Sequence, residues 1–289
     1  MAVHLYTLCW NEADMLGFFF RHYDPWVDRY VVYDDGSTDG SLDILRAHPR
    51  VELRRFERTV ADSFVLSQKN LQNETWKESR GSADWVVITA LDELLEVKGA
   101  VNADYLAASA RGGVTLIPAI GYQMVSEDYP RPHETLSRAR TLGAPFALMN
   151  KLSIFNPDAV RETGFDEGRH RARPAGDLRY PPRDELMLLH YKYLNFERTL
   201  QRQQSQQQGL GTTDVAKGFG SHYHWSTQQL RADWDGFRAR AVDVGATGFR
   251  PWENFQGPRW WHPEEMPPPA PKRGRGWREK LGLGRRAGK

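Results

Sequence analysis

Short apolar runs alternate with helix-like segments over the first hundred residues. Val3–Leu8 predicts a buried strand, and Glu12–Tyr23 predicts a helix because its apolar residues recur three and four positions apart. The pattern continues with a strand at Tyr30–Tyr33, a helix at Ser41–Ala47, a strand at Val51–Arg54, a helix at Phe64–Lys77 and a strand at Trp85–Thr89. Such alternation favours an α/β fold with a largely parallel sheet covered by helices.

The pattern is weaker beyond residue 97. It predicts a helix at Tyr105–Ala110, strands at Val114–Pro118, Leu148–Phe155 and Glu185–Tyr193, and a polar helix at Phe196–Gln208. Residues 121–143 are rich in polar, proline and charged positions and predict a mobile loop over an active site. The glutamine run at 203–208 predicts a solvated helix face. We expect one folded domain over residues 1–265 and a proline-rich, then basic, unfolded tail over 266–289.

Composition narrows the class of protein. The 289 residues carry a net charge of only +2, and residues 272–289 carry eight Lys or Arg against one Glu, so the rest of the chain is net acidic and a general nucleic-acid-binding surface is not expected. The single cysteine, Cys9, excludes an internal disulfide. Because no apolar run approaches the roughly 20 residues of a membrane span, we expect a cytoplasmic protein. The tail, with Trp277, Leu281 and Leu283, predicts either peripheral contact with the inner face of the membrane or a disordered solubilising segment.

Polar pairs follow three of the predicted strands. They are Asn11-Glu12, Asp34-Asp35 and Asp92-Glu93. Because the carboxyl ends of parallel strands meet at one edge of a sheet, these pairs are expected to lie together where α/β proteins bind ligands.

The most specific motif is Asp34-Asp35-Gly36-Ser37-Thr38-Asp39-Gly40. Paired carboxylates at a strand end can hold the imide N–H and the ribose hydroxyls of a nucleotide, and a glycine lets the chain turn away from the base. The alternative is an acidic turn in which Asp39 caps the following helix. Its place directly after a strand favours the nucleotide site.

These residues resemble glycosyltransferase family 2. Val31-Val32-Tyr33 and the acidic motif are similar to the family's nucleotide-binding motif, and Thr7–Glu12 looks like its first strand and loop. Gln68-Lys69-Asn70 resembles the basic residue and asparagine that face the nucleotide. The Asp-Glu-apolar ending and His190-Tyr191 resemble the branch of "glycosyl transferase family 2_4" and family 92-like proteins. The resemblance is strong over residues 3–97 and scattered over 98–200.

The resemblance implies a GT-A fold: a Rossmann-like, mostly parallel central sheet flanked by helices, with an irregular C-terminal part. Residues 1–97 would form the nucleotide-binding half and residues 98–265 the acceptor side. The implied reaction moves a sugar, with inversion, from a nucleoside-diphosphate sugar, expected to be a UDP-sugar, to a saccharide or lipid-linked acceptor. The implied nucleotide-binding residues are Thr7, Asn11, Glu12, Asp34, Asp35, Lys69 and Asn70, with Lys151 on the diphosphate.

The family's metal motif is incomplete in this sequence. Its Asp-any-Asp pattern is replaced by Ala90-Leu91-Asp92, which leaves Asp92 to hold a divalent cation, Mn²⁺ or Mg²⁺. The resemblance points to His190 as a second ligand, and His170, His222 and His224 are alternatives. A plainer interpretation is that Asp92 and Glu93 begin a helix, where carboxylates favour the positive end of the dipole.

Two further roles stay open in the sequence. An inverting transferase needs a carboxylate base, and Glu127, Asp128 and Asp166, beside Glu167, are the candidates. The tryptophans after residue 220 fit either a sugar-binding platform or packing of an irregular C-terminal part. Loss of the first motif aspartate also fits a degenerate domain that binds a nucleotide sugar without turnover. A nucleotidyltransferase is less favoured, because Thr7–Glu12 lacks a glycine-rich phosphate loop.

Overall fold

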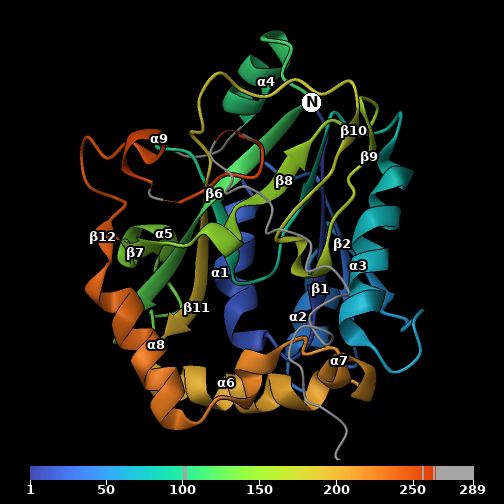
Figure 1. Ribbon diagram of the computed structural model, residues 1–289. Coiled ribbons are helices and arrows are strands. Elements are labelled where there is room, and N and C mark those ends of the chain that lie inside the picture. The colour runs from blue at the N-terminus through green and yellow to red at the C-terminus, as the bar shows by residue number, and fades with distance from the viewer. Residues whose placement is uncertain (100–102, 256, 263, 265–289) are drawn as a thin grey trace, which may run out of the picture.

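The computed structural model describes residues 1–99, 103–255, 257–262 and 264. A ten-stranded sheet runs through them with helices on its faces and at one end (Figure 1). The strands of this sheet are β1 (Val3–Cys9), β2 (Arg29–Asp34), β3 (Val51–Arg55), β4 (Trp85–Ile88), β5 (Glu93–Glu96), β6 (Leu116–Ser126), β7 (Leu142–Pro145), β8 (Lys151–Phe155), β11 (Met187–Leu194) and β12 (Val242–Asp243). A separate ribbon pairs β9 (Val160–Glu162) with β10 (Ala175–Gly176).

The α-helices of the described residues are α1 (Ala13–Tyr23), α2 (Ser41–Ala47), α3 (Phe64–Glu74), α4 (Ala103–Arg111), α5 (Leu136–Ala139), α6 (Phe196–Gly209), α7 (Thr212–Ala216), α8 (Thr227–Ala239) and α9 (Pro251–Asn254). Short 3-10 turns lie at Thr75–Ser79, Ala147–Met149, Glu167–Arg169 and Ser221–His224. The helices predicted within the first hundred residues are confirmed to within a few residues at their ends.

The sheet has a parallel half and a mixed half. In the order β3-β2-β1-β4 all neighbours are parallel, which gives the N-terminal half a Rossmann-like arrangement. Beyond β4 the order continues through β8, β6, β7 and β12 with antiparallel pairs, while β11 is parallel to β6 and antiparallel to β5. The predicted α/β class, a central sheet flanked by helices, is therefore confirmed.

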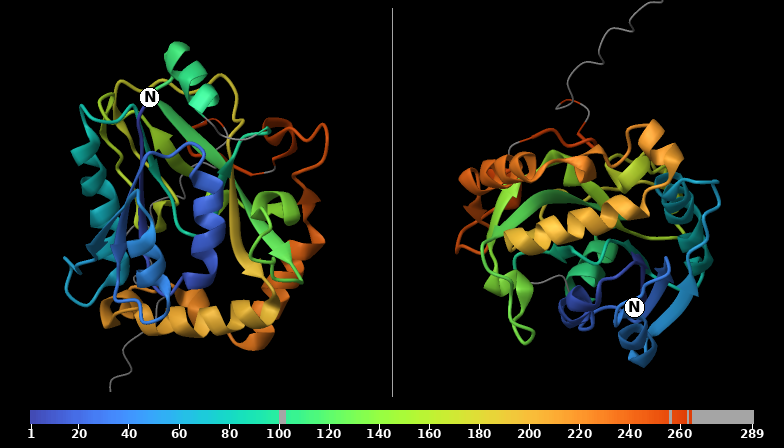
Figure 2. Two further views of the ribbon diagram at one scale, coloured as in Figure 1. Left: turned by 180° about the vertical axis from the view of Figure 1, so that it is seen from behind. Right: turned by 90° about the horizontal axis from the view of Figure 1, so that it is seen from below.

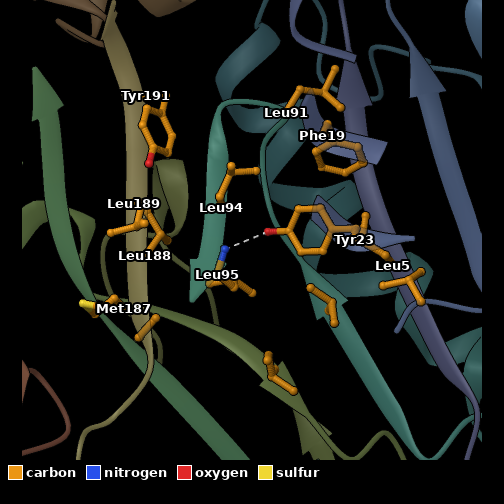
Figure 3. Packing of buried hydrophobic residues seen from close by; sticks show 14 of the residues in the cluster. Leu5, Phe19, Tyr23, Leu91, Leu94, Leu95, Met187, Leu188, Leu189 and Tyr191 are labelled. Carbon is orange, nitrogen blue, oxygen red and sulfur yellow. Dashed lines mark hydrogen bonds between the residues drawn. The ribbon is translucent and has the colours of Figure 1, made fainter. Parts of the chain in front are cut away.

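Helix α1 ties the sheet to the start of β5. Its Met15, Leu16 and Phe19 are fully buried against the parallel strands. The hydroxyl of Tyr23 donates to the carbonyl of Glu93 (2.8 Å) and accepts from the amide of Leu95 (3.1 Å; Figure 3). Because both bonds are buried, they fix the backbone of β5 directly after Asp92, which is the predicted metal ligand.

The predicted loop over residues 121–143 is wrong in its first part. Strand β6 extends to Ser126, and its residues from Leu116 to Val125 are buried. Gly121 has a packing reason to lack a side chain, because a Cβ there would come within 2.4 Å of Met149. The polar Gln123 is tolerated because its side chain is fully hydrogen bonded. Irregular structure remains at residues 127–135, between β6 and α5, and at residues 140–141, between α5 and β7.

Two local expectations about helix starts are also wrong. Glu93 begins strand β5 and not a helix, since β5 pairs with β11. The N-cap of α2 is Gly40. Asp39 instead accepts from the amides of Ser41 (2.9 Å) and Ala13 (3.0 Å), so it holds the starts of α1 and α2 together.

Helix α6 crosses the carboxyl ends of the parallel strands (Figure 2, right). Asn195 caps it by accepting from the amide of Arg198 (3.1 Å). The prediction that the glutamine run is a solvated helix face is wrong for Gln203. This residue is buried and donates to the carbonyl of Trp225 (3.0 Å). Helix α6 therefore forms a cover over this end of the sheet.

The C-terminal tryptophans mostly pack. Trp234 is fully buried and stacks on Tyr193, while Trp260 and Trp261 donate to Asn150 and Asp184. No helix in the described part of the chain is long and apolar enough to cross a membrane. The predicted basic tail, residues 266–289, lies outside the described residues, and so does the expectation of membrane contact through it.

Candidate active site

A cavity of about 650 Å³ opens at the carboxyl ends of β1, β2 and β4. This volume suits an organic ligand larger than a single sugar. Helix α3 contributes one wall, α6 covers the space, and β11 and α8 form the far side. Its charged lining comprises Glu12, Asp35, Asp92, Glu93, Lys151, Arg169, Lys192, Arg202 and Asp233, with His170, His190 and His222.

Arg202 of α6 joins two of the predicted strand-end residues. Its Nη1 donates to Oδ2 of Asp92 (2.8 Å), and its Nη2 pairs with Oε1 of Glu12. Burial opposes ionisation of Asp92, yet the charge of Arg202 holds its pKa well below the ordinary value. Burial raises the pKa of Glu12 to about 7 against the same guanidinium, and the charge of Asp92 adds to that rise. The Arg202 guanidinium thus pairs with both Glu12 and Asp92, and only the pKa of Asp92 lies below its ordinary value.

His190 lies beside Asp92 in a fixed tautomer. The amide nitrogen of Gln123 donates to the carbonyls of Met124 and His190 (both 3.1 Å), so its Oε1 faces the Nδ1 of His190 (2.8 Å) as an acceptor. The Nδ1 of His190 must then carry a proton, which leaves Nε2 with a lone pair in the neutral ring. Nε2 lies 3.5 Å from Oδ2 of Asp92. A histidine oriented by a second residue in this way is suited to bind a metal ion.

Glu93 does not face the cavity as a free ligand. Its two carboxylate oxygens pair with Lys151 (2.6 Å) and Arg169 (2.7 Å), and all three side chains are buried. Burial opposes its charge, but Lys151 and Arg169 lower the pKa of Glu93 to about 2. Arg169 also donates to the carbonyl of Ile88 (2.6 Å). Lys151 is therefore neutralised in a buried ion pair with Glu93 and is not free to bind a diphosphate.

Lys192 differs from the other basic residues of the lining. Within the described chain its ammonium has no carboxylate within 4.0 Å, and it lies 4.9 Å from the ring centroid of Tyr223. Burial lowers its pKa to about 8, so it is largely charged at neutral pH. Lys192 follows His190 by two residues in β11, and alternate residues of a strand share a face. That spacing is the signal by which the sequence could have revealed it.

The acidic motif divides into one ligand-facing and several structural residues. Asp35 lines the cavity and pairs with Arg58 (2.8 Å). Asp34 instead accepts from the amides of Gly36 (2.8 Å) and Ser37 (3.0 Å), which shapes the turn. Gly36 adopts φ +79°, which explains a glycine there. Asp35 is thus the member of the motif placed to meet a ligand.

Other residues predicted to bind nucleotide lie apart from the cavity lining. Asn11 bridges the β1 and β2 loops by accepting from the amides of Thr38 (2.7 Å) and Asp39 (3.3 Å). Thr7 is buried in β1. On α3, Lys69 pairs with Glu167 (2.9 Å) and Asn70 contacts Thr59 (3.4 Å).

The face of α3 toward the cavity instead carries residues spaced four apart. They are Phe64, Gln68 and Gln72. Helical periodicity indicates this face once one of its members is known to point inward.

The three predicted bases also lie away from the lining. Glu127 pairs with Arg238 (2.6 Å), and Asp166 pairs with Arg173 (2.8 Å), both toward solvent. Asp128 is exposed. Of the alternative histidines, His170 and His222 line the cavity, whereas His224 bonds to Gln207. Asp233, Arg202 and Gln123 had no motif that pointed to them.

Comparisons with known proteins find likeness only among solved structures. No family model matches the sequence, and no curated protein matches it. A solved structure described as a mycobacterial protein aligns with 57% of this chain at 17% identity and a TM-score of 0.33, and the match spans 56% of that chain. A 4-diphosphocytidyl-2C-methyl-D-erythritol synthase aligns with 55% of this chain and 76% of its own at 12% identity and a TM-score of 0.27. At such scores the fold class rests on this protein's own strand order.

Proposed function

We propose that the protein is a GT-A glycosyltransferase that moves a sugar from a nucleoside-diphosphate sugar, taken to be a UDP-sugar, to a saccharide or lipid-linked acceptor. The resemblance of residues 3–97 to glycosyltransferase family 2 supports the proposal. The observation that carries it is that Asp35, Asp92 and His190 line one cavity at the carboxyl ends of parallel strands. These residues come from three separate segments of the chain and meet where such folds bind nucleotides.

Each charged group of the cavity then has a role. Asp35 receives the nucleoside, as a carboxylate can accept from an imide N–H or a ribose hydroxyl. Lys192 supplies an unpaired ammonium for the diphosphate, and Arg202 can exchange one carboxylate for a phosphate oxygen. Glu93, Lys151 and Arg169 hold the floor of the site beneath them. Lys192 thereby replaces Lys151 as the expected phosphate ligand.

A divalent cation fits the pair formed by Asp92 and His190. Arg202 and His190 hold the pKa of Asp92 well below its ordinary value, and in the neutral ring the Nε2 of His190 would present a lone pair 3.5 Å from that carboxylate. No group of three or more His, Cys, Asp or Glu suited to a metal occurs within the described residues, so donor phosphates and water would complete the coordination. When bound, Mn²⁺ or Mg²⁺ would supply positive charge to stabilise the leaving diphosphate.

A second candidate is a domain that binds a nucleotide sugar without turnover. Two observations favour it: Ala90 lines the cavity where the resembling enzymes carry a carboxylate, and Arg202 already neutralises Asp92. A guanidinium in that place competes with a cation for the same oxygen. The two candidates share the nucleotide site and differ in whether the sugar is released.

Two measurements test the proposal. A thermal-shift screen across UDP-, GDP-, CMP- and dTDP-sugars should reveal one donor family that raises the melting temperature, because a ligand of the native state alone stabilises it. The donor so found is then incubated with the protein, with and without Mn²⁺, and release of the nucleoside diphosphate is followed. Binding with release supports a transferase, and binding without release supports the degenerate domain. No stabilisation by any of the donors contradicts both.

A further inference from the structure

We propose that Asp233 is the base that takes the proton from the acceptor hydroxyl, and that the acceptor group beside it is a sugar. This inference rests on the proposed transfer reaction. It assigns a residue that no sequence motif indicated, in place of the three predicted carboxylates that lie outside the cavity.

The carboxylates that line the cavity differ in their ion pairing. Five carboxylates line the cavity: Glu12, Asp35, Asp92, Glu93 and Asp233. The first four are each paired with at least one arginine or lysine. Asp233 has no Lys, Arg or His within 4.0 Å in the part of the chain that the structure describes. A carboxylate held by a cation is less free to approach a substrate hydroxyl, so Asp233 is the lining carboxylate best placed to receive the proton.

Asp233 is held in place by its helix and by the hydroxyl of Tyr193. It lies on α8, which Ser226 and Gln229 begin with a capping box. The next residue, Trp234, is fully buried and stacks on Tyr193 with ring centroids 5.1 Å apart. The hydroxyl of Tyr193 donates to Oδ2 of Asp233. Its Oδ1 accepts no hydrogen bond from the described residues, and so one oxygen is fixed while the other is open to a substrate.

Aromatic side chains line the cavity together with Asp233. Phe146, Tyr193 and Phe237 line the same cavity and pack together, with centroids 5.0 Å apart for Phe146 and Phe237 and 5.8 Å for Tyr193 and Phe237. Tyr193 and Phe237 are buried, whereas Phe146 is only partly buried and can offer apolar surface to a sugar ring. A carboxylate next to an aromatic wall is therefore suited to a saccharide hydroxyl.

The chemical step is balanced without any further reactant. The acceptor O–H proton passes to Oδ1 of Asp233 as the acceptor oxygen forms its bond to the anomeric carbon. The bond from that carbon to the diphosphate oxygen breaks, and the diphosphate keeps the electron pair. Protonated Asp233 then returns its proton to water before the next cycle.

The test compares Asp233→Asn with Asp235→Asn in the full chain. Asp235 is a matched control, because it lies on the same helix, pairs with Arg238 (3.3 Å) and is absent from the cavity lining. The donor is the one found by the thermal-shift screen, and the acceptors are water and a panel of methyl glycosides. We expect Asp233→Asn to lower kcat by about 100-fold or more while donor Kd and melting temperature stay near the wild type. Asp235→Asn should match the wild type in all three.

A further variant separates position from chemistry. Tyr193→Phe removes the hydroxyl that holds Asp233 and should lower kcat by a smaller factor, about 10-fold, with donor Kd unchanged. Full activity of Asp233→Asn in an active wild-type background overturns the role of Asp233 alone. A wild type that binds donor but transfers to neither water nor glycosides overturns the transferase function, and the role of Asp233 with it.

Discussion

The Nε2 atom of His190 lies 3.5 Å from Oδ2 of Asp92, although the two residues come from different parts of the chain. Strand pairing brings them together. In the antiparallel pairing of β5 with β11, His190 is opposite Glu93, and the amide of Tyr191 donates to the carbonyl of Asp92 (2.7 Å). Gln123 then fixes the imidazole. The backbone therefore sets the proximity of these two groups, and their use depends on what binds between them and Arg202.

The first prediction concerns coupling between metal and nucleotide. Because Asp92 and His190 provide only two ligands, Mn²⁺ should bind weakly alone and more tightly with UDP, and UDP should gain the same factor from Mn²⁺. Asp92→Asn should abolish this coupling and most activity. Calorimetric titrations of Mn²⁺ with and without UDP measure it, with the exposed His133→Gln as control. A UDP affinity indifferent to Mn²⁺ in the wild type would mean that the site works without metal or is no working transferase.

The second prediction restores the missing carboxylate. Ala90 lines the cavity next to Asp92, so Ala90→Asp should add an oxygen ligand to the pair. Mn²⁺ should then bind before nucleotide, with the calorimetric Kd for metal alone falling by about 10-fold or more. Ala90→Asn has similar size without the charge and serves as control. Equal metal affinity in the two variants would show that position 90 does not face the cation.

The third prediction separates the two lysines. Lys192 has no ion pair in the described chain, so Lys192→Met should weaken UDP binding by about 10-fold with little change in stability. Lys151→Met leaves Glu93 with one of its two buried partners, so it should destabilise the fold by about 3 kcal/mol. Urea unfolding and UDP titration of both variants check this. If Lys151→Met weakened UDP binding and Lys192→Met destabilised the fold instead, Lys151 would be the residue that binds the diphosphate.

The fourth prediction divides the acidic motif. Asp35 lines the cavity, so Asp35→Ala should remove most nucleotide affinity and leave the fold intact. Asp34 holds the turn through two amides, so Asp34→Ala should lower the free energy of unfolding by about 1–3 kcal/mol. Thermal unfolding and UDP calorimetry of each variant provide the comparison. Wild-type UDP affinity in Asp35→Ala would remove the main support for the nucleotide site.

The fifth prediction is a pH dependence of stability. The pKa of Glu93 falls from an ordinary 4.5 to about 2 in the folded protein, because Lys151 and Arg169 outweigh the effect of burial. Its ionised form therefore stabilises the fold above about pH 4.5, and this contribution is lost as the pH falls toward 2. Glu93→Gln should cost about 3 kcal/mol at pH 7 and progressively less below pH 4.5. Urea unfolding of the wild type and Glu93→Gln at several pH values tests this prediction. A difference in the free energy of unfolding that stays constant from pH 7 to pH 2 would contradict the lowered pKa of Glu93.

The motif on α3 and the geometry of α3 indicate different residues. The motif predicts Lys69 and Asn70 as nucleotide ligands, whereas the helix turns Gln68 and Gln72 toward the cavity. Gln123 was assigned to a mobile loop because its neighbourhood is polar. It is buried because its own side chain satisfies three hydrogen-bonding groups of β6 and β11.

Local sequence is enough to predict the parallel half of the sheet and the strand ends at which Asp35 and Asp92 lie. Apolar periodicity and turn residues act over a few positions, so local sequence contains this information. Only the tertiary structure decided which charges remain available. Arg202 reaches Glu12 and Asp92 from a distant helix, and Lys151 is neutralised by Glu93 while Lys192 is not. Ion pairing and burial depend on distances between segments remote in the chain, which no local pattern specifies.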